Sequence, residues 1–308
     1  NPSSISGYSA SGPIIITGAI TFTQANSLNA VDATYIQATI SETTVANLSG
    51  IAVNNSSRAS LNKFSMVISD TSATAAELTA VQALTSVAVD ATNITAIESS
   101  SAADITALFS ATTVPTGAST DPITVSDTTI SATTLNAIDG YTTGAVDATA
   151  ATTITGPLAD IKTAMESTGI TDEADIAVTV TDTTIDAADL NTVNGLTTGV
   201  VTCSNATTLT GIDSAVETAL TANASVDANN AKDEIDGLDA VNVTLDDPDT
   251  AGTQSYAVEE VRDIIDLTTG VVTATITEGT ITALTNTNGT GLHGTSGNAL
   301  TITVTDAN

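Results

Sequence analysis

Apolar and polar residues alternate with two different periods through the middle of the chain. Residues 123–127 alternate apolar and polar side chains, which is the period-two pattern of a half-buried strand. Leu135 and Ile138 then stand three apart, on one face of a short helix. Residues 146–149 return to period two, and residues 158–165 to a helical stripe. The pattern predicts the order strand, helix, strand, helix.

The same order returns along the chain with a spacing of about 57 residues. The phrase V-S-D-T-T-I at 125–130 reappears as V-T-D-T-T-I at 180–185, and the Thr-Thr-Gly turn at 142–144 reappears at 197–199. An earlier copy begins near Ile68. The repeat indicates that the architecture is set by stacking of similar segments.

We divide the chain into five segments on this basis. Residues 1–64 form a β-rich N-terminal region with a degenerate repeat, which caps the protein or joins subunits. Repeats follow at 65–122, 123–177 and 178–223, and residues 224–308 form a diverged repeat with an acidic insertion and a C-terminal β segment. Besides those in the 123–177 repeat, helices are expected at residues 75–84, 102–108, 227–239 and 258–266.

The fold class expected from this pattern is an α/β repeat protein. Each half-copy supplies a strand and a short helix, so we predict an elongated solenoid with about two strand–helix coils per ~57-residue repeat. The alternative is a row of β-rich tandem mini-domains. Domains that small are marginally stable without disulfides, metals or large aromatic side chains, so stacking is favoured.

The apolar content of the chain comes from small aliphatic residues. There are three Phe, four Tyr and no Trp in 308 residues. Thin layers of Ala, Val, Ile and Leu suit a narrow interior better than a broad recognition surface, which draws on aromatic rings. The β-branched content and the positive mean hydropathy argue against intrinsic disorder.

The charge balance is strongly acidic. Asp and Glu number 35 against five Lys and Arg, which gives a formal net charge of −30. Such a surface repels nucleic acid and anionic lipid, both of which require basic clusters. High ionic strength would screen its self-repulsion. No stretch approaches the ~20 uninterrupted apolar residues of a membrane helix, so membrane insertion is not expected.

The sequence offers little catalytic chemistry. The single histidine, His293, has no partner at a zinc-ligand spacing, and no phosphate loop, dinucleotide fingerprint or nucleophile elbow is present. The single cysteine, Cys203, stands where other copies have Ala91 and Ala148, so we expect a small buried side chain. We predict that the protein is not an enzyme.

Recurring aspartates form the one candidate site. Asp70, Asp127 and Asp182 occupy one position of the repeat, and Asp90 and Asp147 occupy another. Carboxylates with threonine and carbonyl oxygens can bind calcium, so these five are candidate calcium ligands. The alternative is that they cap turns and solvate strand edges, with no cofactor at all. Neither an EF-hand nor a glycine-rich calcium nonapeptide is present.

The two ends of the chain are β-prone on both faces. Residues 12–22 and 299–304 are rich in Ile, Thr, Ala and Leu. A strand at the edge of a sheet must be protected or used for pairing. We expect these segments either to cap the protein or to pair with the next copy in a head-to-tail homopolymer.

Residues 65–275, and above all the phrases at 125–156 and 178–201, resemble Thr/Ala/Asp-rich arrays in very large secreted surface proteins of marine cyanobacteria and other aquatic bacteria. The resemblance implies an extracellular structural or adhesive role. We therefore predict a secreted or cell-surface protein that forms a filament, sheath or surface layer. The alternative is the shaft of a phage tail fibre or tailspike. Contact with glycans or a cell surface is left open by Asn-x-Ser/Thr sequons at Asn47, Asn54, Asn55, Asn93, Asn205, Asn223, Asn242 and Asn288.

Overall fold

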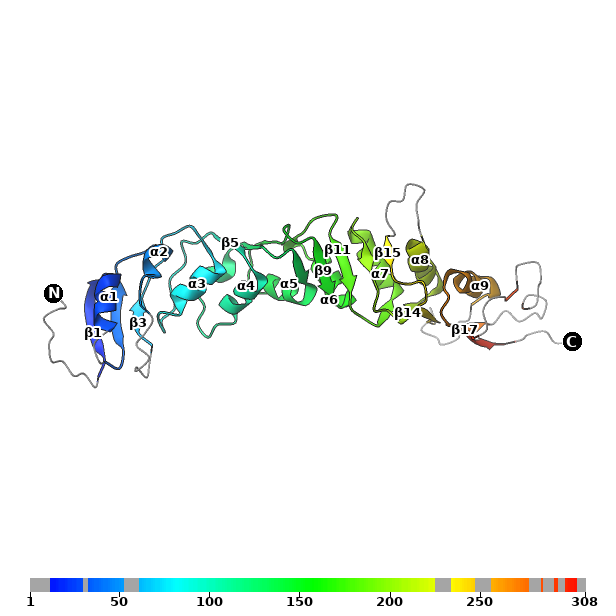
Figure 1. The fold of residues 1–308 in the computed structure, drawn as a ribbon, viewed down its shortest axis with the longest axis horizontal. Coiled ribbons are helices and arrows are strands. Elements are labelled where there is room, and N and C mark those ends of the chain that lie inside the picture. Colours follow the sequence, from blue (N-terminus) through cyan, green and yellow to red (C-terminus); the bar gives the residue numbers. More distant parts are fainter. Residues whose placement is uncertain are drawn as a thin grey trace. The chain divides into compact units, whose positions relative to one another are not determined.

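The computed structural model describes residues 12–29, 33–52, 61–224, 234–246, 256–276, 284, 291–292 and 297–303. Along these residues, successive short helices are separated by one to three short strands (Figure 1). The helices are α1 (Phe22–Asn29), α2 (Val45–Leu48), α3 (Ala75–Gln82), α4 (Ala102–Phe109), α5 (Ala132–Asp139), α6 (Leu158–Glu166), α7 (Ala187–Leu196), α8 (Asp213–Ala224) and α9 (Val258–Leu267).

The described strands are short and form four sheets, in which every neighbouring pair is parallel. The first sheet has the order β1 (Ile14–Ile20), β2 (Ile36–Ile40), β3 (Lys63–Ser65). The second is β10 (Ile170–Thr171), β8 (Val146–Asp147), β6 (Ile123–Val125), β5 (Ala96–Ser100), β4 (Ser72–Thr74). The third is β15 (Ile235–Asp236), β13 (Val201–Thr202), β11 (Ala177–Val180), β9 (Thr153–Gly156), β7 (Thr129–Ser131). The fourth is β12 (Thr184–Asp186), β14 (Thr208–Gly211), β16 (Asn242–Leu245), β17 (Val272–Ile276), β18 (Ala299–Ile302).

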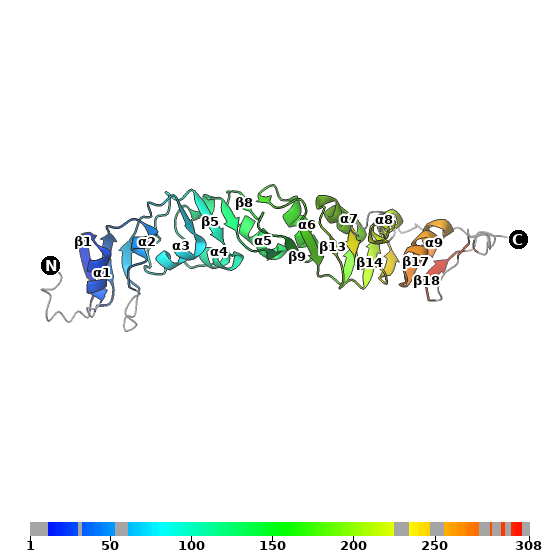
Figure 2. The same cartoon turned by 45° about the horizontal axis from the view of Figure 1, so that its top comes forward.

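The sheets belong to two compact units. The first unit comprises residues 1–127, 137–150 and 168–171, and contains the first and second sheets. The second comprises residues 128–136, 151–167 and 172–308, and contains the third and fourth sheets. Within the first unit α3 packs beside α4, and within the second α7 packs beside α8 (Figure 2).

The predicted elongated solenoid is wrong: the described strands group into four parallel sheets, two in each of two compact α/β units. The sequence repeat sets the strand–helix order but not how strands group, because a strand of two to five residues can pair on either side. The alternative of tandem mini-domains is also wrong. The second sheet takes β4 and β5 from the 65–122 repeat and β6, β8 and β10 from residues 123–177, so the repeats are not separate domains.

The predicted positions of individual helices agree with the structure better than the predicted fold class does. The two helices expected in the 123–177 repeat are present as α5 and α6, and three of the four expected elsewhere are present as α3, α4 and α9. Helix α3 begins with a capping box, in which Thr74 Oγ1 accepts from Glu77 N and Glu77 Oε2 accepts from Thr74 N. The helix predicted over 227–239 is wrong where it is described, because Ile235 and Asp236 form strand β15.

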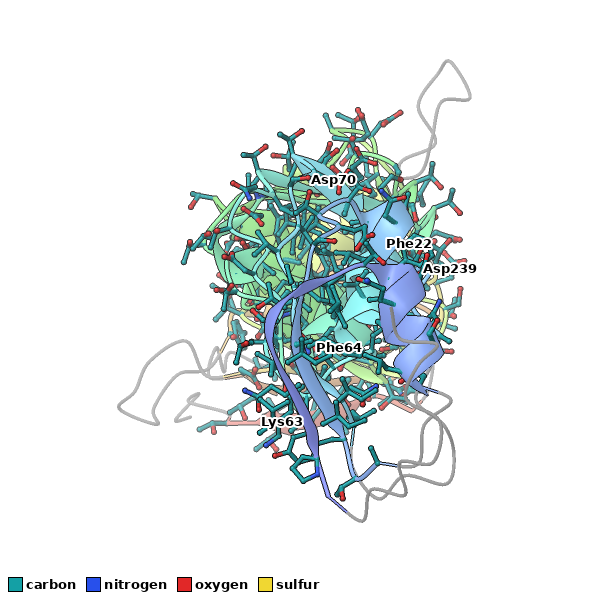
Figure 3. The ribbon with its side chains drawn as sticks, turned by 90° about the vertical axis from the view of Figure 1, so that its left-hand side faces the viewer. Phe22, Lys63, Phe64, Asp70 and Asp239 are labelled. Atoms are coloured by element: carbon teal, nitrogen blue, oxygen red, sulfur yellow. The ribbon has the colours of Figure 1, made fainter. Side chains whose placement is uncertain are left out.

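Small aliphatic side chains fill the interior of the described residues. Leu135 and Ile138 of α5, predicted to face inward, are fully buried, as are Val146 and Ala148. Phe64 of β3 is a fully buried aromatic residue, and its neighbour Lys63 points outward (Figure 3). No helix among the described residues is long and apolar enough to cross a membrane.

A turn with the sequence Thr-Thr-Gly connects helix to strand in three places. The first threonine of each turn donates its hydroxyl to the carbonyl that precedes a neighbouring strand: Thr142 to Asp121 at 2.6 Å, Thr197 to Ile176 at 2.6 Å and Thr268 to Val241 at 2.8 Å. The same hydroxyls accept from the N–H groups of Gly144, Gly199 and Gly270. Glycine is required because a Cβ at Gly199 or Gly270 would overlap that carbonyl oxygen.

Candidate functional site

The first set of predicted aspartates caps helices. The Oδ2 atoms of Asp70, Asp127 and Asp182 accept hydrogen bonds from the N–H groups of the first residues of α2, α4 and α6. The N···O distances are 2.7 Å from Val45, 2.6 Å from Ala102 and 2.6 Å from Leu158. A carboxylate in this place satisfies a helix N–H that has no partner within the helix, and it opposes the positive end of the helix dipole.

These caps link residues far apart in the sequence. Asp70 and Asp127 reach back 25 residues, and Asp182 reaches back 24. Each cap therefore connects a turn that follows one strand to the helix of the preceding strand–helix segment. Sequence periodicity placed the three aspartates in one position of the repeat but did not reveal their partners.

The second set of predicted aspartates stabilises turns. Asp90 Oδ1 accepts from the backbone N–H and the hydroxyl of Thr92, at 3.1 and 2.7 Å. Asp147 Oδ1 accepts from the same two groups of Thr149, at 3.0 and 2.7 Å. The hydrogen bond from the Thr92 hydroxyl is the main cause that lowers the pKa of Asp90 from its usual value.

The structure does not gather the five aspartates into one site. Among the described residues, no three His, Cys, Asp or Glu side chains are grouped as metal ligands. Each of the five instead accepts a hydrogen bond from a backbone N–H group. Calcium binding by these residues stays a prediction. His293 lies outside the described residues.

Asp121 is a buried carboxyl that the sequence pattern did not single out. It lies just before strand β6, at the position that Ile176 and Val241 occupy before β11 and β16, and the residue is only 7 % exposed. Its Oδ2 atom has no hydrogen-bond partner. Burial raises the pKa of the Asp121 carboxyl, because removal from water disfavours the charged form.

Cys203 is a structural residue. It is fully buried, as are Ala91 and Ala148 at the corresponding positions, which confirms the prediction of a small interior side chain. Burial, followed by the negative charges of Asp236 and Asp182, raises the pKa of its thiol to about 12. A thiol with so high a pKa supplies almost no thiolate at neutral pH and is a poor nucleophile.

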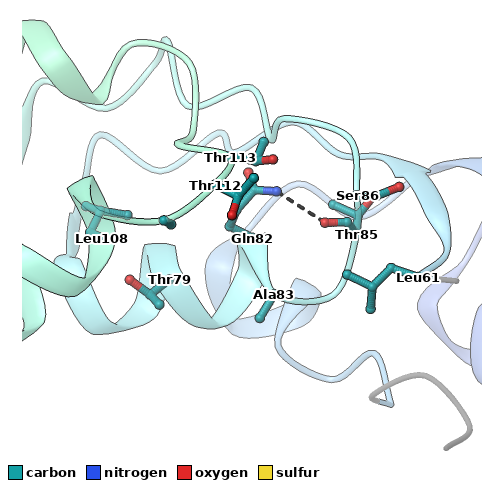
Figure 4. A pocket seen from close by; sticks show the side chains of 10 residues that line it. Leu61, Thr79, Gln82, Ala83, Thr85, Ser86, Leu108, Thr112 and Thr113 are labelled. Atoms are coloured by element: carbon teal, nitrogen blue, oxygen red, sulfur yellow. Dashed lines mark hydrogen bonds between the residues drawn. The ribbon is translucent and has the colours of Figure 1, made fainter.

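A pocket of about 380 Å³ lies beside helices α3 and α4 (Figure 4). Apolar groups of Leu61, Ala83 and Leu108 line it, together with threonine and serine hydroxyls. Gln82 also lines the pocket. Its Nε2 donates to the carbonyl oxygens of Thr85 and Val87, and its Oε1 accepts from the N–H of Val89. The residues that line this pocket include no titratable side chain, so they offer no acid, base or charged ligand for catalysis.

The three described basic side chains are engaged with neighbours. Lys162 Nζ lies 2.6 Å from an Asp189 oxygen, and an Arg262 guanidinium nitrogen lies 2.6 Å from Asp263. Lys63 Nζ lies 4.4 Å from the centre of the Tyr35 ring. The carboxylates, which greatly outnumber these residues, leave the surface negative.

The two terminal strands, β1 and β18, differ from the strands within the sheets. Each is an edge strand with one described neighbour, β2 for β1 and β17 for β18. Both expose isoleucine: Ile15 is 60 % exposed and Ile302 is 39 % exposed. Neither strand contains a charged residue. Among the other edge strands, β3, β12 and β15 carry Lys63, Asp186 and Asp236, whereas β4, β7 and β10 are uncharged strands of two or three residues that expose no large apolar side chain.

Edge strands of soluble proteins are commonly protected by charged side chains, and uncharged apolar edges are prone to pair with other strands. Strands β1 and β18 combine an uncharged edge with an exposed isoleucine, so among the described edge strands they are the best suited to recognise another protein. Comparisons of the chain with family models, with curated proteins and with solved structures found no match.

Proposed function

We propose that this chain is an extracellular structural protein that assembles with copies of itself into a filament, sheath or surface layer. The observation that carries the proposal is the pair of uncharged edge strands, β1 and β18, each of which exposes an isoleucine. An unprotected edge presents a row of backbone donors and acceptors to another strand. The role is mechanical, and no catalytic step is part of it.

The acidic surface supports a protein that works in the presence of salt. With a net charge of −30, copies repel one another at low ionic strength. The Debye length falls from about 30 Å at 0.01 M salt to about 8 Å at 0.15 M, so added salt favours contact between copies. The resemblance of residues 65–275 to arrays in secreted bacterial surface proteins supports the extracellular location and an adhesive role.

Sedimentation velocity and negative-stain microscopy of the full chain test the proposal. We expect assemblies that grow with protein concentration and with salt between about 0.01 and 0.5 M, because screening removes the repulsion. A monodisperse monomer under all these conditions would contradict self-assembly. Short trimeric spikes on virions in native material would favour the tail-fibre alternative.

The location is tested separately on the source cells. An antibody against the purified chain should detect it in the surface or medium fraction of intact cells. Detection only after lysis would contradict the extracellular role, whatever the purified protein does.

A further inference from the structure

Strand β18, at the edge of the fourth sheet, has apolar side chains on the core face that are not fully buried. Leu300 and Ile302 stand opposite Ala274 and Ile276 of β17, which are both buried. Residues opposite one another in a parallel pair lie on the same face of the sheet. Leu300 and Ile302 therefore lie on the core face, yet Leu300 is only half-buried and Ile302 is exposed.

The outer edge of β18 has no described strand beside it to pair with its backbone N–H and C=O groups. In a parallel sheet the N–H and C=O of one residue point to the same neighbouring strand, and successive residues point to opposite sides. Thr303 N donates to Ile276 O, so Thr303 points toward β17. By alternation Leu300 and Ile302 direct their N–H and C=O groups to the free edge.

Strand β1 offers the complementary surface. Ile14 stands opposite Ile36, which is fully buried, so Ile14 lies on the core face, where it is half-buried. Ile14 N donates to Tyr35 O, toward β2. Ile15 therefore directs its N–H and C=O to the free edge of β1. Helix α1 follows β1 directly and supplies the buried side chains of Ala25 and Leu28.

We propose that β18 of one copy pairs in parallel with β1 of a second copy, with Leu300 opposite Ile14 and Ile302 opposite Ile16. In this register the N–H of Leu300 meets the C=O of Pro13, and the C=O of Leu300 meets the N–H of Ile15. Pro13 has no N–H, and this register asks it only for a carbonyl. This joint rests on the self-assembly put forward above and names the surfaces that make it.

Three observations favour a second copy at this edge. All pairs of described strands are parallel, and the joint continues that arrangement. The two strands bring no carboxylate together, although the chain has 35. In a joint between β18 and β1, helix α1 follows β1 and lies near the joint. In a joint between two β18 strands no described helix would do so, because none follows β18. The β1–β2 register shifts between Ile15 and Ala19, so the directions of Ile14 and Ile15 set the register of the joint, and Ile16 is placed opposite Ile302 by continuing it.

Such a joint is heterologous, because it uses different surfaces on the two copies. Each copy then joins one neighbour through its β18 edge and a second neighbour through its β1 edge. Blocking either edge stops growth but leaves the other edge competent. This property separates the joint from a symmetric contact between two β18 edges or two β1 edges.

The test uses Ile15→Pro and Ile302→Pro in the full chain. Each substitution removes an N–H that points away from the chain's own sheet, and proline is tolerated where a strand N–H faces solvent. We expect each variant alone to be monomeric by sedimentation velocity, with the far-ultraviolet circular dichroism of the parent. An equimolar mixture should form a one-to-one dimer, because one variant keeps β18 and the other keeps β1.

The matched controls are Ile15→Val and Ile302→Val, which keep the N–H and the β-branched side chain and should assemble like the parent. If both proline variants assemble like the parent, the joint is wrong although self-assembly stands. If one proline variant alone still dimerises, the contact is symmetric and the joint is again wrong. If the parent itself never assembles, both proposals fall.

Discussion

Strands β11 and β18 have similar sequences, A-V-T-V and A-L-T-I, but very different surroundings. β11 lies between β9 and β13, and its Val178 and Val180 are each 1 % exposed. β18 has one described neighbour, and its corresponding aliphatic residues remain half-buried or exposed. The burial of an aliphatic residue here depends on whether a next strand is present, so β18 has the composition of an interior strand at an edge.

The same substitution in both strands gives the largest expected contrast. Val180→Asp places a carboxylate in a dry interior and should lower the free energy of unfolding by about 3–5 kcal/mol, the range for an uncompensated buried charge. Ile302→Asp should change it by only about 0.5 kcal/mol, the range for surface positions. Urea denaturation followed by circular dichroism measures both. At a salt and protein concentration at which the chain is monomeric, equal losses would show that β18 is covered within a single copy.

Two glycines of one segment provide the next contrast. A Cβ at Gly199 would overlap the Ile176 carbonyl, so Gly199→Ala should cost about 3 kcal/mol by forcing the turn away from its strand. Gly195, within α7, has open space around it. Gly195→Ala should stabilise the protein by about 0.5–1 kcal/mol, since alanine favours the helix. Thermal melts of the two variants should shift in opposite directions, and shifts of the same sign would refute the turn argument.

The third contrast compares Asp121, the buried residue before β6, with the apolar residues Ile176 and Val241 at the same position before β11 and β16. Asp121→Val copies Val241 and should stabilise the protein by about 1–3 kcal/mol at pH 7, because an unpaired buried carboxyl oxygen is removed. The pKa of Asp121 is raised in the folded state above its ordinary value of 3.8. The parent chain therefore loses stability as the pH rises from that value through the folded-state pKa.

The difference between Asp121→Val and the parent should accordingly shrink as the pH is lowered toward 3.8. Urea denaturation of both proteins at several pH values between about 4 and 7 measures it. A difference that does not depend on pH would show that the Asp121 carboxyl is not the cause.

The smallest expected effect concerns the helix caps. Asp182→Ala removes the acceptor for Leu158 N at the start of α6 and should cost about 1 kcal/mol, the typical value of a lost cap. Asp182→Asn keeps an acceptor oxygen and should cost less. Glu166→Ala, at the exposed end of the same helix, is the control and should be neutral. If Asp182→Ala and Glu166→Ala had equal effects in urea titrations, the cap would carry no stability.

The sequence predicted local structure well because side-chain period and capping residues act over a few residues. Leu135, Ile138 and Cys203 are buried as their positions in the repeat indicate. Grouping of the strands into four sheets was not predictable from period alone, since short strands with the same alternation can pair in several ways. The partners of Asp127 and Thr142 lie 25 and 21 residues away, a distance at which periodicity shows recurrence but not contact.

Each aspartate cap spans nearly the same length of chain, 24 or 25 residues. Donor and acceptor of every such bond thus lie within one copy of the repeat and the start of the next. Duplication or loss of a whole copy in the gene would add or remove complete bonds of this kind, so each helix capped in this way would keep a carboxylate at its start. Chain length can then vary in steps of one repeat while each remaining junction keeps its chemistry.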